Sequence, residues 1–345
     1  MPLLFLWLTL LLPAAWADLP LEDASQPPPS LPTAVEVGLR LVALTHLDPP
    51  KEPFPNFRAE VLLEARWRDP RLSFDPDRTG GEPERYQGTK AQRASDTMWW
   101  PDLGVENEDG PRLIEHQELD IYPDGRVRYV ERFAVRAHAD VDLRRFPFDH
   151  QQLSLRIASQ VWPATHLTLS VAASEVSHDP THKNLEWLIH ELSAEVSTED
   201  RLRAHAPVDV LRTTLHIERQ PGFYLYKLLL PLVLIVIFTW TAFWLKDEPS
   251  PGRMQRTFVA LLTVVAFHHI VAGHLARVPY LTFVDAVVYA AFLSVGATLA
   301  QIIRIHNAQH AGDVDRAHRL EAMGRYAHPV GFFITLIVLW VWFHR

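Results

Sequence analysis

The chain has 345 residues, of which 48% are hydrophobic and 21% are charged, with a formal net charge of −8 and no cysteine. This length is enough for two domains, and the lack of cysteine excludes thiol catalysis, zinc–thiolate sites and redox switching. No basic tract or ladder of basic and aromatic residues occurs, so the sequence argues against a nucleic-acid partner.

The first seventeen residues have the pattern of a secretory signal peptide. An apolar core from Leu3 to Leu12 precedes Ala15-Trp16-Ala17, whose small-x-small form suits signal peptidase. A first transmembrane helix is the alternative, but the apolar run is short for about 30 Å of hydrocarbon. We therefore predict a signal peptide at 1–17 and an exported domain at 18–221, which core packing must hold together without disulfides.

Residues 18–221 are rich in charge and contain short runs in which apolar and polar residues alternate. Such runs occur at Val35–Leu41, Phe57–Trp67, Leu153–Ile157, His166–Val171 and Val210–Ile217. Pro123-Asp124-Gly125 is a strong hairpin turn between two further runs. Alternation is typical of strands with one wet face, so we predict an all-β, immunoglobulin-like sandwich in this extracellular part.

Residues 222–345 carry few charges outside short segments and contain four apolar stretches. We predict transmembrane helices at about 223–245, 254–274, 279–304 and 328–344. Tryptophans near the ends of these stretches suit the membrane interface, and the loops expected inside are richer in Lys and Arg than the outer loop. We expect a multi-pass protein of the cell (inner) membrane whose N-terminal domain is extracellular or periplasmic.

Several motifs follow one another in a specific order. They are Trp99-Trp100-Pro101-Asp102, Tyr122-Pro123-Asp124-Gly125, Asp142 with Phe146-Pro147-Phe148-Asp149, Arg219 before the first span, Pro231 within it, Leu261–Ala266 and Arg277-Val278-Pro279-Tyr280. With these motifs the chain resembles the pentameric ligand-gated ion channels (the Cys-loop receptor superfamily), in their cysteine-free bacterial branch. The resemblance implies a homopentamer around a central pore, in which each subunit has a β-sandwich and an all-α four-helix transmembrane domain. It implies no cofactor and no enzymatic activity.

The resemblance assigns the pore lining to the second span. The residues expected to face the pore are Gln255, Val259, Leu262, Ala266, His269 and Gly273. Their spacing of three and four residues places them on one side of a helix, and rings of Leu262 and Ala266 would form an apolar constriction that expels water. A buried bundle helix is the alternative, because polar residues are scattered around this span. His269 is either a pH or metal sensor or a neutral pore residue, and we favour the second interpretation.

Charge selectivity stays open between two patterns. Pro251-Gly252 stands before the pore helix, as in anion-selective relatives, whereas Asp247 and Glu248 a few residues earlier would form an acidic ring. We favour a cation channel, with an anion-selective channel of the same family and a non-conducting membrane-anchored receptor as alternatives. A membrane enzyme is a weaker hypothesis, since His190-Glu191 lacks the second histidine of a zinc protease motif.

The resemblance also implies surfaces that couple the sandwich to the helices and a site for the stimulus. The coupling residues are Asp48, Pro147, Phe148, Asp149, Arg219, Arg277 and Pro279, with a charge pair expected between Asp149 and Arg219. The agonist-site residues are Trp99, Trp100, Trp162, Arg201, Arg203 and His205. Arginines suit a carboxylate better than an amine, and a proton or hydroxide is a further candidate agonist, given 18 histidines. Permeating inorganic ions and membrane lipid complete the expected partners.

Overall fold

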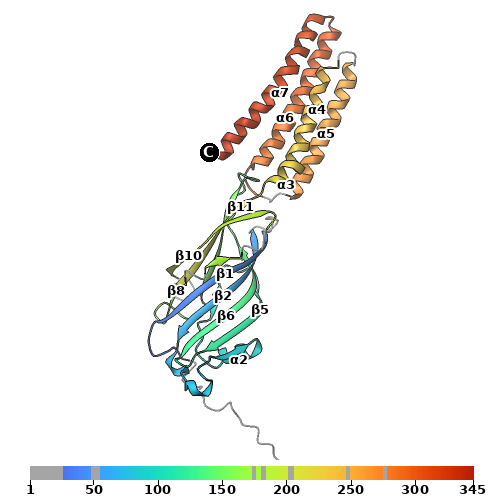
Figure 1. Ribbon diagram of the computed structural model, residues 1–345. Coiled ribbons are helices and arrows are strands. Elements are labelled where there is room, and N and C mark those ends of the chain that lie inside the picture. Colours follow the sequence, from blue (N-terminus) through green and yellow to red (C-terminus); the bar gives the residue numbers. More distant parts are fainter. Residues whose placement is uncertain are drawn as a thin grey trace, which may run out of the picture.

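The structure is a computed structural model that describes residues 26–47, 55–172, 176–179, 184–200, 206–245, 249–274 and 278–345. The expected signal peptide at 1–17 lies outside the described residues, as do the expected site residues Asp48, Arg201, Arg203, His205 and Arg277. Two parts are stacked end to end, a β-sandwich and a bundle of long helices (Figure 1).

The strands of the N-terminal part form two sheets. One sheet has the order β3-β5-β6-β2-β1-β8, with β9 paired to β1, and the other has the order β10-β11-β7-β4. The bounds are β1 Thr33–Leu47, β2 Asn56–Arg68, β3 Glu84–Gln87, β4 Leu103–Val105, β5 Leu113–Ile121, β6 Arg126–His138, β7 His150–Ser159, β8 Leu167–Val171, β9 Ser177–His178, β10 Trp187–Asp200 and β11 Pro207–Arg219. Short helices lie at η1 Pro70–Leu72, η2 Pro76–Arg78 and α2 Thr89–Ser95. The predicted sandwich is confirmed.

The core of the sandwich follows from the alternation of side chains along each strand. In β2, every second residue from Phe57 to Trp67 is buried, and β6 repeats the pattern from Val127 to Ala137. Burial of this apolar area stabilises the domain without any disulfide. Between β5 and β6 the predicted turn is present, and it requires Gly125, whose φ is 78° and whose added Cβ would lie 2.6 Å from the Asp69 carbonyl oxygen.

The first helical segment changes its winding along its length. It runs through α3 (Gly222–Tyr224), the π-helical η4 (Leu225–Leu229), α4 (Leu230–Trp240) and the 3₁₀ turn η5 (Thr241–Phe243). The π turn ends two residues before Pro231, whose ring and missing N–H would disturb a regular α-helix that continued through it. The described helices that are long and apolar enough to cross a membrane are Gly222–Phe243, α6 (Phe283–His310) and α7 (Val314–His344), whereas α5 (Ser250–His274) is more polar.

The last three helices differ in their bounds from the sequence-based expectation. α6 begins at Phe283 rather than near 279 because Thr282 and Asp285 form a reciprocal capping box. α7 begins at Val314 rather than near 328, where the Asp313 side chain accepts a hydrogen bond from the Arg316 amide. Hydropathy misses this inner half of α7 because its exposed face is polar.

Candidate functional site

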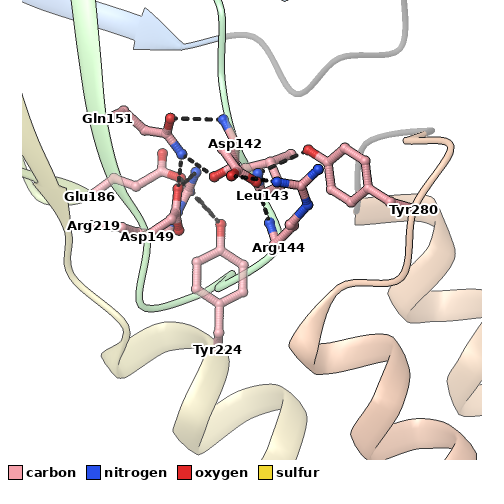
Figure 2. A network of polar contacts seen from close by, with 9 residues as sticks. All are labelled: Asp142, Leu143, Arg144, Asp149, Gln151, Glu186, Arg219, Tyr224 and Tyr280. Carbon is pink, nitrogen blue, oxygen red and sulfur yellow. Dashed lines mark hydrogen bonds and ion pairs between the residues drawn. The ribbon is translucent and has the colours of Figure 1, made fainter. Parts of the chain in front are cut away.

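The sandwich and the helices meet at a buried ion pair (Figure 2). Asp149 stands directly before β7, and Arg219 is the last residue of β11. Arg219 Nε donates to Asp149 Oδ1 at 2.8 Å, and the Arg219 amide donates to the Asp149 carbonyl at 3.1 Å. Asp149 is 1% and Arg219 7% exposed, so water screens their attraction little. The opposite charges that were expected to pair are therefore in contact.

The Arg219 guanidinium is also enclosed by groups from three other elements. Its Nη1 donates to Glu186 Oε1 at 2.6 Å, and the Tyr224 hydroxyl of α3 donates to the same oxygen at 3.2 Å. The central carbon of the Arg219 guanidinium lies 4.1 Å from the centroid of the Trp187 ring and 4.9 Å from that of the Phe146 ring. Both rings therefore add cation–π attraction. Sequence reasoning missed Glu186 and Tyr224, because neither belongs to a motif that pairs with Arg219.

A second polar link joins the loop before β7 to the segment between α5 and α6. The Leu143 amide donates to the Tyr280 hydroxyl at 3.0 Å, and the Arg144 guanidinium lies over the Tyr280 ring at 5.1 Å (Figure 2). Gln151 connects this link to the ion pair, because its Nε2 donates to both the Asp142 carbonyl and Asp149 Oδ2. The expected coupling residue Pro279 is exposed beside Tyr280.

The Phe146-Pro147-Phe148 tip inserts between the helix ends. Phe146 is buried against Tyr224, with ring centroids 4.6 Å apart. The centroid of the Phe148 ring lies 4.7 Å from that of Trp340 and 5.4 Å from that of His344, both in α7. It lies 5.9 Å from the ring centroid of Phe283 in α6. Pro147, between them, is buried and follows a cis peptide bond. This single loop therefore contacts α3, α6 and α7.

α5 has one buried and one exposed face within the protomer. Thr257 and Val264 are 1% and 0% exposed, whereas Val259 and Leu262 are 58% and 68% exposed. The expected pore residues Gln255, Val259, Leu262, Ala266 and His269 all lie on the exposed side. Gly273 is on the same helix, beyond the part whose side-chain surroundings are described. His268 is half-buried, with its ring 6.2 Å from the rings of Tyr289 and Phe292.

The tryptophans expected at the agonist site form one cluster. Trp162 Nε1 donates to the Trp100 carbonyl at 2.7 Å, and the rings of Trp99 and Trp162 are 6.1 Å apart. Trp99 is 1% exposed and packs edge-on against Trp67 in the sandwich core. Trp100 and Trp162 are half-buried. Of these three rings, Trp100 and Trp162 are partly exposed, whereas Trp99 is buried.

Residues 20–221 match the family described as the neurotransmitter-gated ion-channel ligand binding domain. The match spans the described sandwich up to the first helix and covers more than half of the chain. The chain belongs to this family of pentameric ligand-gated ion channels. It is a channel and not an enzyme. It is a multi-pass membrane protein, and its sandwich is extracellular.

Three relatives show how far the likeness extends. The channel is 27% identical to a proton-gated ion channel of Gloeobacter violaceus over 335 residues, which cover 95% of this chain and 88% of the relative. It is 23% identical over 278 residues to a gamma-aminobutyric acid receptor subunit beta-4 of Gallus gallus, with 77% and 54% covered. It is 26% identical over 240 residues to a pH-sensitive chloride channel 2 of Drosophila melanogaster, with 66% and 45% covered. The channel thus spans most of the first relative and about half of the other two.

Proposed function

We propose that five copies of the chain surround a pore lined by α5 and conduct cations when a stimulus acts on the sandwich. The exposed stripe of α5 carries this proposal. It places the polar side chains Gln255 and His269 on the same face as Val259 and Leu262. Polar groups facing lipid are costly, so a water-filled lumen suits this mixed face better than hydrocarbon does.

The apolar middle of the stripe supplies a gate. Five Leu262 side chains, with Val259 and Ala266 one turn to either side, would form a narrow apolar passage around the axis. Such a passage expels water and so blocks ions without a plug. Gln255 would place a ring of amide groups on the inner side of this gate, where they replace part of an ion's hydration shell.

The charges at the inner end of α5 support cation selectivity. Arg253 is 2% exposed, and its Nη1 donates to Glu321 Oε1 of α7 at 2.7 Å. This arginine therefore adds no net charge to the mouth, which leaves Asp247 and Glu248, outside the described residues, as the expected acidic ring. An anion-selective channel is the second candidate, because Arg256 is exposed on α5 and the Drosophila relative is named a chloride channel.

Protons are the stimulus to test first, because the names of two relatives refer to protons or pH. Small carboxylates come second, since Arg201 and Arg203, which lie outside the described residues, suit a carboxylate better than an amine. Membrane lipid would cover the outer half of α7. Its exposed apolar side chains there are Val330, Phe333, Ile334, Ile337, Val338 and Trp342.

Purified channel in planar bilayers tests these proposals. In a salt gradient of KCl, currents evoked by a step in external pH should reverse near the potassium equilibrium potential; reversal near the chloride potential would establish the anion alternative.

The pore lining is tested with single-cysteine variants, because the chain has no cysteine of its own that could react. A water-soluble thiol reagent should block Gln255→Cys and Leu262→Cys channels and spare the matched control Thr257→Cys, whose position is buried. Block of Thr257→Cys alone would show that another face lines the pore.

A further inference from the structure

Two histidines stand one helical turn apart at the end of α6. His306 and His310 are four positions apart in sequence, which places their side chains on the same side of the helix. The centroids of the two rings are 4.3 Å apart, and the ring planes meet at 75°. His306 is half-buried and His310 is exposed. Neither imidazole forms a hydrogen bond or ion pair with another described residue, so the ring nitrogens are available to a ligand from solution.

The spacing of the two imidazoles suits a single metal ion. An imidazole nitrogen binds Zn²⁺ at about 2.0–2.1 Å, so two nitrogens that share one ion lie about 3 Å apart and their rings are close neighbours. The rings of His306 and His310 are already that close. The last side-chain torsion of histidine is broad, so a rotation of each ring aims both nitrogens at one point without any movement of the helix. The same spacing of four residues holds the ion in helical zinc motifs.

The surroundings of the pair favour a divalent transition metal ion. His310 is the last residue of α6, and the carbonyl end of a helix carries a partial negative charge that attracts cations. Imidazole suits Zn²⁺, Ni²⁺ and Cu²⁺, whereas Mg²⁺ and Ca²⁺ prefer oxygen ligands. The described residues contain no group of three or more His, Cys, Asp or Glu side chains that could hold a metal ion. Water would therefore complete the coordination shell, and the ion would exchange with solution.

We propose that His306 and His310 bind a divalent transition metal ion on the cytosolic side of the membrane. α6 begins beside the extracellular sandwich, where the Phe283 amide donates to the loop before β7 at 2.9 Å, so its other end faces the cytosol (Figure 1). Next to the pair, Gln309 Oε1 accepts from the Ser250 hydroxyl at 2.8 Å, and Ser250 is the first residue of α5. The bound ion would thus lie beside the contact between α6 and the inner end of α5.

Binding of a nickel chelate to the full-length channel without an affinity tag tests this site. In Ni²⁺–nitrilotriacetate, the chelator leaves two adjacent coordination positions of the ion open, and two neighbouring imidazoles fill both of them. The fluorescently labelled chelate is titrated into detergent-solubilised channel. We expect saturable binding that free Zn²⁺ displaces and Mg²⁺ does not. His310→Ala and His306→Ala should each weaken binding at least about tenfold, because the ion loses one of its two protein ligands.

Two further histidines supply matched controls. His318 is exposed on the neighbouring helix α7, and His318→Ala should leave the affinity for the chelate unchanged. His190 and His150 contact the same oxygen of Glu218 at 2.8 and 3.6 Å, so imidazoles also gather on the sandwich. His190→Ala should likewise leave the affinity unchanged. Size-exclusion chromatography shows whether each variant assembles as the wild type does.

The outcomes separate this site from the other histidines and from the proposed pore. Wild-type affinity in an assembled His310→Ala channel would overturn the proposal, as would a lack of binding by the wild type. Binding lost in His190→Ala and kept in His310→Ala would assign the metal to the sandwich and contradict the site on α6. If His306→Ala fails to assemble, His310→Ala decides, because its side chain is exposed. Binding is measured without any current, so the result does not depend on which helix lines the pore.

Discussion

Asp149 and Arg219 form a two-point contact at the junction, in which the Asp149 carboxylate accepts from the Arg219 guanidinium and the Asp149 backbone carbonyl accepts from the Arg219 amide. Asp149→Asn removes one charge of a buried pair, which costs about 3–5 kcal/mol when the partner stays buried. We expect evoked current to fall at least about tenfold per channel at the membrane surface, since the loop that contacts three helices loses its anchor. The double variant Asp149→Arg with Arg219→Asp, which swaps the two charges, should restore part of the current.

Asp142→Asn is the matched control for this experiment. Asp142 lies in the same loop, but its side chain is 61% exposed where it pairs with Arg144, and exposed pairs contribute about 1 kcal/mol or less. Surface labelling separates lost assembly from lost gating in each variant. Equal losses in Asp142→Asn and Asp149→Asn, or additive losses in the Asp149 and Arg219 single and double variants, would show that the pair does not act as a unit.

The sequence predicts the sandwich and the four helical segments, because each leaves a local pattern. The Asp149–Arg219 contact joins residues 70 apart, and only the resemblance to the family led us to expect it. Other features depend on packing that no local pattern records. Trp99 and Trp100 both pack edge-on against Trp67, and only the folded chain decides that Trp99 is the buried one of the two. Glu321 reads as a solvated charge, because its partner Arg253 is 68 residues away in sequence.

Leu262→Thr should make the channel easier to open. A hydroxyl on each of five side chains would wet the apolar constriction, and a change of about 1.4 kcal/mol in the opening equilibrium corresponds to roughly tenfold in the open-to-closed ratio. Dose–response curves for external pH, with open probability from single channels, measure this shift.

Val264→Thr is the control for the Leu262 experiment. Val264 is 0% exposed, so its new hydroxyl enters the helix bundle and not the proposed lumen. Such burial costs about 1–3 kcal/mol of stability and should not ease opening. The gate assignment is wrong if Val264→Thr shifts the opening equilibrium as Leu262→Thr does, or if Leu262→Thr leaves it unchanged.

The free energy of unfolding of the sandwich should depend on pH in part through the protonation of Glu131. Burial raises the pKa of Glu131 above 4.5, against the opposing charge of Arg112, whose Nη1 lies 3.7 Å from Oε2. A raised pKa means that the folded protein holds this proton more tightly than the unfolded chain. The contribution to the free energy of unfolding is therefore full below pH 4.5 and is lost as the pH rises through the folded pKa.

Urea unfolding of the full chain, followed by tryptophan fluorescence from pH 4.5 to 8, measures this contribution. One proton accounts for a slope of at most about 1.4 kcal/mol per pH unit in the free energy of unfolding, and Glu131→Gln should remove that share.

The pKa of Glu64 is shifted in the opposite direction, downward. Although burial alone would raise its pKa, hydrogen bonds and charges of Arg128 and Arg66 lower it, so its stabilisation is present above pH 4.5 and lost on acidification. Parallel changes in Glu131→Gln and Glu64→Gln would contradict this assignment.

Gly324 and Gly331 offer a matched pair on α7. A Cβ at Gly324 would lie 2.8 Å from the Phe243 ring, whereas a Cβ at Gly331 would have nothing within 4 Å. Phe243 is 1% exposed, so its ring is enclosed by the bundle and the new methyl group must displace it. Gly324→Ala should destabilise the bundle by about 1–3 kcal/mol through overpacking, and Gly331→Ala should be neutral or gain up to about 1 kcal/mol from helix propensity.

Thermal unfolding of the detergent-solubilised channel compares the two alanine variants. We expect a lower melting temperature for Gly324→Ala, whereas Gly331→Ala, about two helical turns further along α7, should melt at or slightly above the wild-type temperature. Equal melting temperatures would mean that α7 does not pack this closely on η5.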